Sequence, residues 1–171
     1  MINIGDTIPE AALAVVGENG GENDGENDAL YYESTSELFD HGRFVLVGIP
    51  GVFTPVCTNQ HMTELIANAE SIKAQDISQI YCISDDNPWA MNEWRKVIPS
   101  NYMITFLSDG NRDFLNATGL HNNDSELFVS SHYCRFLAII ENRVLKSLRV
   151  EDHVCNVSCT TGREDIVLEE A

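Results

Sequence analysis

The chain has 171 residues, of which 43% are hydrophobic, and carries a formal net charge of -17 at pH 7. This length and composition suffice for one domain with a single buried core. Nucleic acids and anionic membranes are excluded as expected partners, because binding to either requires a basic face. No stretch approaches the roughly 20 apolar residues that would cross a bilayer.

Residues 1–6 show no targeting signal. They contain neither a basic segment followed by an apolar run nor the arginine-rich pattern of a transit peptide. We therefore expect a cytoplasmic protein. In that reducing compartment, the five cysteines are expected to be thiols or transient redox partners rather than structural disulfides.

Residues 17–28 repeat a four-residue motif of glycine, asparagine and acidic residues. Such a segment cannot bury anything, which predicts a solvated loop between two short N-terminal strands. A calcium loop is the alternative, since carboxylate and amide oxygens suit that ion. The segment lacks the spacing and final glutamate of an EF-hand, so we expect no metal.

An apolar strand at residues 44–49 is followed by Pro50, Gly51 and an amphipathic helix. The helix has the spacing of one buried face, with apolar residues at Met62, Leu65, Ile66, Ala69 and Ile72. Cys57 falls in the first turn of this helix. Unpaired N–H groups and the helix dipole there favour a thiolate and are expected to lower its pKa below about 8.5. This placement predicts a nucleophilic cysteine.

Strand and helix patterns alternate in the middle of the chain. Strands are predicted at residues 77–84 and 104–107, and helices at 89–97 and 111–118, with Gly119 closing the second helix.

The last part of the chain has the pattern of a hairpin followed by a helix. Residues 135–141 and 144–150 are predicted strands, joined only by a two-residue turn at 142–143. Capping-box spacing in residues 161–164 predicts a final helix through Leu168. The whole order predicts an α/β fold with helices on both faces of a mixed central sheet.

Residues 50–57, Pro-Gly-Val-Phe-Thr-Pro-Val-Cys, with His61 one turn further on, resemble the active-site signature of peroxiredoxins, specifically of the type-five subfamily. The similarity continues in the family's order through 82–88, Trp94, 107–110, 135–140 and 150–151. The resemblance implies one thioredoxin-like domain over residues 1–171. It also implies thiol-dependent reduction of hydrogen peroxide and small organic hydroperoxides without a cofactor. A non-enzymatic redox sensor or relay would use the same cysteine.

Cleavage of a peroxide requires an ionised cysteine, an aligned substrate and fixed donors for the departing oxygen. The hydroxyl of Thr54 can donate to the thiolate or hold a peroxide oxygen, and Arg135 supplies a permanent charge and a planar set of donors. Pro55 is expected to wall the pocket against water. By resemblance, these three match the family's threonine, arginine and proline around Cys57. Taken singly, the first two could be a helix cap and a surface charge.

The signature also assigns residues to the peroxide pocket. Pro50, Gly51, Pro55 and His61 are expected to line it. His61 could act as a general base for Cys57. We favour an orienting role, because arginine and the helix end already account for ionisation.

The oxidised cysteine must condense with a second thiol before it is oxidised further. By resemblance, Cys159, eight residues after Glu151, is the expected resolving cysteine of an intramolecular disulfide. Cys155 could substitute for it or pair with it, and many single-cysteine relatives use glutathione or glutaredoxin instead. Thioredoxin or glutaredoxin with glutathione is the expected reductant. Disulfide formation would require the first helical turn to unwind locally.

The remaining candidates are interpreted structurally. Cys82 is predicted to be core, and Cys134 to point away from Arg135, because side chains alternate along a strand. A zinc site at His153 with Cys155 and Cys159 lacks a fourth ligand.

His132 stands where many relatives carry a second arginine, which predicts a less basic pocket whose charge changes near pH 6 to 7. An exposed Phe53 would suit a homodimer contact, although core packing would explain it equally well.

Overall fold

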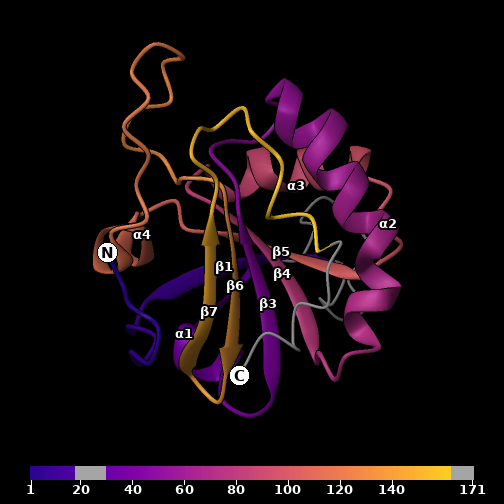
Figure 1. Ribbon diagram of the computed structural model, residues 1–171, viewed down its shortest axis with the longest axis vertical. Helices are drawn as coiled ribbons and strands as arrows, with labels where there is room; N and C mark the ends of the chain where they lie inside the picture. Colours follow the sequence, from indigo (N-terminus) through magenta and orange to yellow (C-terminus); the bar gives the residue numbers. More distant parts are fainter. Residues whose placement is uncertain (18–29, 163–171) are drawn as a thin grey trace.

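The computed structural model describes residues 1–17 and 30–162. The strands form one mixed sheet in the order β2-β1-β5-β4-β3-β6-β7 (Figure 1). Their bounds are β1 (Ala12–Val16), β2 (Leu30–Ser34), β3 (Arg43–Gly48), β4 (Gln79–Ser84), β5 (Ile104–Ser108), β6 (Phe136–Glu141) and β7 (Val144–Val150). β3, β4 and β5 are parallel neighbours, and the other pairs are antiparallel.

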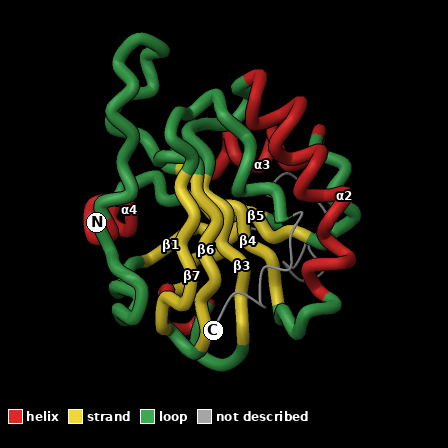
Figure 2. The backbone as a smooth tube through the Cα atoms, viewed as in Figure 1, coloured by secondary structure: helices red, strands yellow, loops and turns green. Residues whose placement is uncertain are grey.

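Helices cover both faces of this sheet (Figure 2). α2 (Met62–Lys73) and α3 (Pro88–Val97) pack on one face, and α1 (Thr35–Leu38) and α4 (Asp113–Thr118) on the other. The predicted α/β fold with a mixed sheet is therefore confirmed. Among the described residues, no helix combines the length and apolarity needed to cross a membrane.

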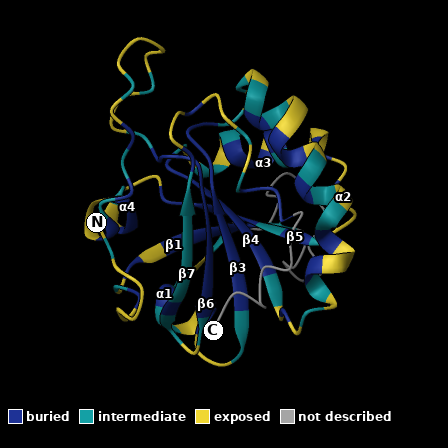
Figure 3. Ribbon diagram, viewed as in Figure 1, coloured by how far each residue is buried: buried dark blue, intermediate teal, exposed yellow. Residues whose placement is uncertain are grey.

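Alternation along β3 explains why two cores form. Val45 and Val47 join the core under α2 and α3, whereas Phe44 and Leu46 join the opposite core. The strand is buried on both faces, because it lies inside the sheet between β4 and β6 with helices covering both sides (Figure 3).

The predicted hairpin is present, with a tight turn at Asn142 and Arg143. Their φ angles of 48° and 67° are both left-handed, the geometry of a two-residue turn that matches the strand twist. Gly119, with φ of 67°, ends α4 as predicted.

Two predictions of helices are corrected or lie outside the described residues. The first turn after Pro55 is not a regular α-helix, because a π-helical turn, η1 (Cys57–His61), precedes α2. The Met62 amide donates to the Cys57 carbonyl, which is five residues earlier, and this spacing defines a π-helical turn. Of the predicted last helix, Thr161 and Gly162 are not helical, and the rest lies outside the described residues, as do residues 18–29.

Candidate active site

Cys57 is fully buried, two residues after the helical backbone begins at Pro55. The preceding loop is held by two hydrogen bonds. The amide of Val52 donates to the Asp86 carboxylate at 2.8 Å, and the Thr54 hydroxyl donates to the Gly51 carbonyl at 2.9 Å. The predicted position of the cysteine in the first helical turn is therefore observed.

Arg135 reaches Cys57 from a distant part of the chain because of sheet register. β6 pairs antiparallel with β3, so that Phe136 lies opposite Gly48 and Arg135 meets the loop that follows β3. A Cβ at Gly48 would lie 1.9 Å from the Phe136 ring, so this close packing requires glycine.

The guanidinium of Arg135 is buried and contacts three groups. Nη1 lies 3.3 Å from the Cys57 sulfur and 2.8 Å from Nδ1 of His61, and Nη2 donates to the Val154 carbonyl at 2.6 Å. Arg135 thus brings a fixed positive charge to the sulfur of the predicted nucleophile.

The ring of His61 is held between Arg135 and the C-terminal segment. Arginine can only donate, so Nδ1 accepts from Arg135, and Nε2 carries the proton that it donates to the Thr160 carbonyl at 2.9 Å. Burial and then the Arg135 charge lower the pKa of His61 to about 4, so the ring is neutral at physiological pH. This geometry fits the predicted orienting role.

Thr54 and the prolines occupy positions that the signature alone does not reveal. The hydroxyl proton of Thr54 is committed to Gly51, which leaves its oxygen to accept a hydrogen bond. Pro50 and Gly51 are buried, whereas Pro55, predicted to wall the pocket, is exposed. Phe53 is also exposed, at 55%, with a left-handed φ of 56°.

The segment of residues 151–161, here called the tail loop, is closed by one carboxylate. Glu151 accepts from the hydroxyl and the amide of Ser158, both at 2.7 Å, from the Cys159 amide at 2.8 Å and from the Thr160 hydroxyl at 2.9 Å. Burial opposes ionisation, but these hydrogen bonds outweigh it and lower the pKa of Glu151 to about 2.

Both tail cysteines neighbour residues that contact the site. Cys155 follows Val154, whose carbonyl binds Arg135, and Cys159 precedes Thr160, whose carbonyl binds His61. Cys155 is exposed and Cys159 is half-buried, and both are free thiols. Burial, followed by the charge of Glu151, raises the pKa of Cys159.

The contribution of the tail loop to the site was not predicted from the sequence. Val154 and Thr160 contribute backbone carbonyls, which no side-chain pattern marks. The acceptor role of Glu151 depends on how the chain folds back. The available signal was the occurrence of Glu151 just after a predicted strand, with hydroxyl residues shortly downstream.

The other cysteines lie where they were predicted. Cys82 is fully buried, and burial raises its pKa. Cys134 packs in the core on the face of the sheet opposite to Cys57. Burial raises the pKa of Cys134 to about 11.

Two histidines make contacts that the sequence did not indicate. His132 lies 2.9 Å from the Asp85 carboxylate, which also binds Arg112. His153 lies 2.6 Å from Asp124. Within residues 1–17 and 30–162, the structure shows no group of three or more metal-ligating side chains.

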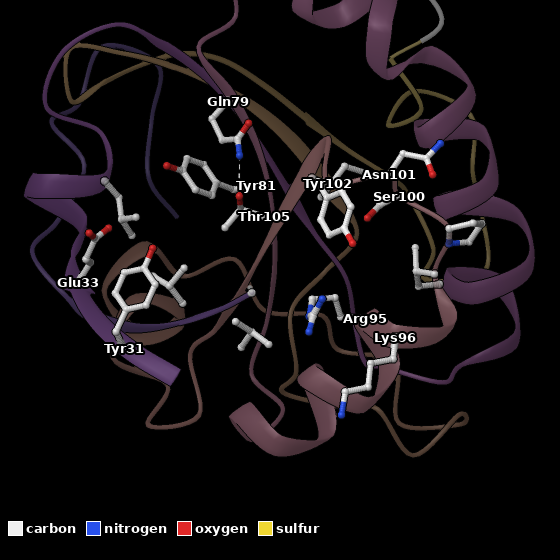
Figure 4. Close-up of a pocket in the computed structure, with 17 residues that line it drawn as sticks. Tyr31, Glu33, Gln79, Tyr81, Arg95, Lys96, Ser100, Asn101, Tyr102 and Thr105 are labelled. Carbon is white, nitrogen blue, oxygen red and sulfur yellow. Dashed lines mark hydrogen bonds between the residues drawn. The ribbon is translucent and has the colours of Figure 1, made fainter. Parts of the chain in front are cut away.

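A hollow of about 950 Å³ lies elsewhere, lined by residues of β1, β2, β4, β5 and the end of α3 (Figure 4). Tyr31, Arg95 and Tyr102 project around it. None of the predicted site residues lines this hollow, so it is separate from the candidate active site.

Comparison with known proteins places this geometry in a family. The model of the family described as Redoxin matches residues 4–159. Rice peroxiredoxin-2C is 34% identical over 151 residues, which cover 88% of each chain. The chain belongs to the peroxiredoxins. Peroxiredoxin-2C of Arabidopsis thaliana is 28% identical over 150 residues, again covering 88% of each chain.

Solved structures agree with this assignment. Reduced Prx3 from Vibrio vulnificus, in complex with H2O2, superposes with a TM-score of 0.79 at 28% identity and covers 94% of each chain. The Plasmodium falciparum antioxidant protein, a 1-Cys peroxiredoxin, gives 0.77 at 27% identity, covering 89% of this chain and 86% of that chain. Peroxiredoxin 5 from Alvinella pompejana, at 21% identity and a TM-score of 0.72, shares the fold. This peroxiredoxin is therefore a peroxidase of the oxidoreductase class, with a peroxide as substrate and a thiol as reductant.

Proposed function

We propose that Cys57 attacks hydrogen peroxide and small organic hydroperoxides and becomes a sulfenic acid. The observation that carries this proposal is the 3.3 Å contact between Arg135 Nη1 and the Cys57 sulfur. A guanidinium at this distance stabilises negative charge on sulfur. A structural relative, reduced Prx3 from Vibrio vulnificus, has been solved in complex with H2O2, which supports hydrogen peroxide as the proposed substrate.

In the first step, the thiolate sulfur forms a bond to one peroxide oxygen as the O–O bond breaks, and the departing oxygen takes a proton from solvent to leave as water or an alcohol. Arg135 offers charge and donors to this developing anion. Thr54 retains acceptor capacity for the peroxide O–H. Pro50 and Gly51 form the buried side of the pocket, and Pro55 its outer edge.

His61 acts in this scheme through Arg135. The neutral ring accepts a hydrogen bond from Nη1 and thereby fixes the plane of the guanidinium. Because the ring carries no positive charge, it does not repel the guanidinium.

Resolution follows by the thiol of Cys159, which condenses with the sulfenic acid to give a disulfide and water. The position of Cys159 beside Thr160 supports this assignment, since Thr160 already contacts His61. Cys57 is fully buried, so the tail loop or the π-helical turn η1 must open for the two sulfurs to meet. The signature at residues 50–57 with His61 supports the proposed assignment to the type-five subfamily, and intramolecular resolution by Cys159 is consistent with that assignment.

We further propose that thioredoxin, or glutaredoxin with glutathione, reduces the disulfide in the cytoplasm. These reductants keep cytosolic thiols reduced. Exposed Phe53 beside the site supports a homodimer contact within the same proposal.

Trapping with dimedone, which labels sulfenic acids, tests this function. After one equivalent of peroxide, the Cys159→Ser variant should carry dimedone on Cys57, whereas wild type should contain a Cys57–Cys159 disulfide. Cys134→Ser is the control, because that thiol lies on the opposite face. A Cys57 disulfide that persists in Cys159→Ser would overturn the assigned resolving cysteine, and absence of any adduct on Cys57 would overturn the proposed chemistry.

A further inference from the structure

The tail loop contains an exposed thiol that the proposed cycle does not use. Cys155 is exposed, whereas Cys57 is completely buried. We propose that Cys155 is a second resolving cysteine, which attacks the Cys159 sulfur of the Cys57–Cys159 disulfide and moves the disulfide to Cys155 and Cys159. This inference rests on the proposed function, because it begins from the disulfide that Cys159 forms.

Cys155 and Cys159 are confined to one short loop. The Glu151 carboxylate binds Ser158, Cys159 and Thr160, so the chain from Glu151 to these three residues forms a short closed loop. A turn in which the Asn156 amide donates to the His153 carbonyl at 2.9 Å folds the middle of this loop. Cys155 and Cys159 are thus held in one small loop, four residues apart.

The two sulfurs of the Cys57–Cys159 disulfide belong to residues with oppositely charged neighbours. Arg135 contacts the Cys57 sulfur at 3.3 Å, whereas the Cys159 amide is 2.8 Å from the Glu151 carboxylate. Negative charge is therefore stabilised on the Cys57 sulfur and disfavoured on Cys159, whose pKa is raised by burial and by Glu151. A thiolate leaves more readily from the side that stabilises it, so attack at Cys159 that expels Cys57 is favoured.

The exchange is balanced without any further oxidant. The Cys155 thiolate forms a bond to the Cys159 sulfur as the Cys57–Cys159 bond breaks, and the electron pair leaves with Cys57 as a thiolate. The number of disulfides is unchanged.

As a result, Cys57 returns to its reduced form beside Arg135, and the disulfide now lies in the tail loop between half-buried Cys159 and exposed Cys155. A protein reductant can attack an exposed disulfide without opening the buried site.

The stoichiometry of peroxide consumption without a reductant tests this relay. With two equivalents of hydrogen peroxide, reduced wild type should consume about two per chain in the fast phase, because Cys57 is regenerated once, whereas Cys155→Ser should consume about one. Asn156→Ser is the matched control, an exposed neighbour without a thiol, and should behave as wild type. Alkylation and peptide mapping should find Cys155–Cys159 with free Cys57 at the first equivalent.

The other possible results distinguish failure of the Cys155 exchange from failure of the proposed peroxidase function. Wild type that stops at about one equivalent, with a Cys57–Cys159 disulfide and alkylatable Cys155, overturns the relay and leaves the proposed function intact. A Cys155–Cys159 disulfide that forms equally fast in Cys57→Ser also overturns the relay, because peroxide would then oxidise the loop directly. Failure of Cys57 to be oxidised in any variant would overturn the proposed function itself.

Discussion

Arg135 links the nucleophile, a neutral histidine and the tail loop through one guanidinium. The residue types could be predicted, because a thiol that cleaves peroxide needs nearby donors and a permanent charge. The contact of Arg135 with the Val154 carbonyl and that of His61 with the Thr160 carbonyl could not be predicted, since backbone acceptors leave no pattern in the sequence. The hydroxyl of Thr54 bonds to Gly51 because the loop geometry brings the two together locally.

Arg135→Lys should lower kcat/KM for hydrogen peroxide roughly 100-fold or more, the usual loss when one fixed donor to a developing anion is removed. Lysine keeps the charge but cannot make the three contacts of the planar guanidinium. Stopped-flow kinetics with the folded variant, checked by circular dichroism, measures the effect. Arg112→Lys, which alters the contact with Asp85, is the control and should change kcat/KM little. Activity of Arg135→Lys near that of wild type would contradict the role given to the guanidinium.

His61 should make stability depend on pH. Its folded pKa of about 4 lies below the ordinary histidine pKa of 6.5, so the unfolded state binds more protons between these values, and stability falls as pH decreases through this range. From pH 7 to pH 5, wild type should lose about 2 kcal/mol through this group.

Urea unfolding of wild type and His61→Gln at both pH values measures this loss as the difference between their profiles. His41→Gln, at an exposed position, should follow wild type. Parallel profiles for wild type and His61→Gln would refute a neutral, buried His61.

At the scale of elements, periodicity and turn chemistry predicted β3, the hairpin and α3 closely, because each depends on local pattern. α1 was missed, since its four residues depend on the capping box between Ser34 and Glu37 rather than on an apolar stripe. The π-helical turn η1 was also missed, because one extra residue in a helical turn leaves the apolar spacing of α2 intact.

The tail loop should loosen when Glu151 loses its charge. Glu151→Gln keeps the shape of the side chain but weakens the acceptor for four donors, so hydrogen exchange at Ser158 and Cys159 should accelerate about tenfold. Alkylation of Cys159 should also become faster near neutral pH, because the carboxylate that raises its pKa is gone.

Exchange mass spectrometry and timed alkylation measure both effects. Glu141→Gln, which removes a partly exposed partner of Arg43, is the control. Unchanged exchange in the tail loop of Glu151→Gln would mean that this carboxylate does not hold the loop closed.

At the scale of the whole molecule, the mixed sheet was predicted but its strand order was not. Composition gives no information on which strands are neighbours, and the pairing of β6 with β3 depends on contacts between residues about ninety positions apart, such as Gly48 and Phe136. That pairing is what carries Arg135 to Cys57.

The net charge of -17 should affect reduction by anionic thiols. Raising the ionic strength from about 0.01 to 0.15 M shortens the screening length from about 30 to about 8 Å. The kcat/KM for glutathione should therefore rise several-fold, while that for neutral dithiothreitol should stay constant. Peroxidase assays at both salt concentrations decide this, and a decrease with glutathione would point to a local basic entry that dominates the net charge.

Peroxide reduction depends on the thiol of Cys57 in the proposed cycle. Stopped-flow mixing of reduced protein with hydrogen peroxide, with sustained turnover followed in the presence of thioredoxin or glutaredoxin and glutathione, tests it directly. Wild type is expected to consume peroxide rapidly and continuously, and Cys57→Ser to fall to the rate of the reductants alone. Equal consumption by the two proteins, or no sustained consumption by wild type with either reductant, would contradict the account.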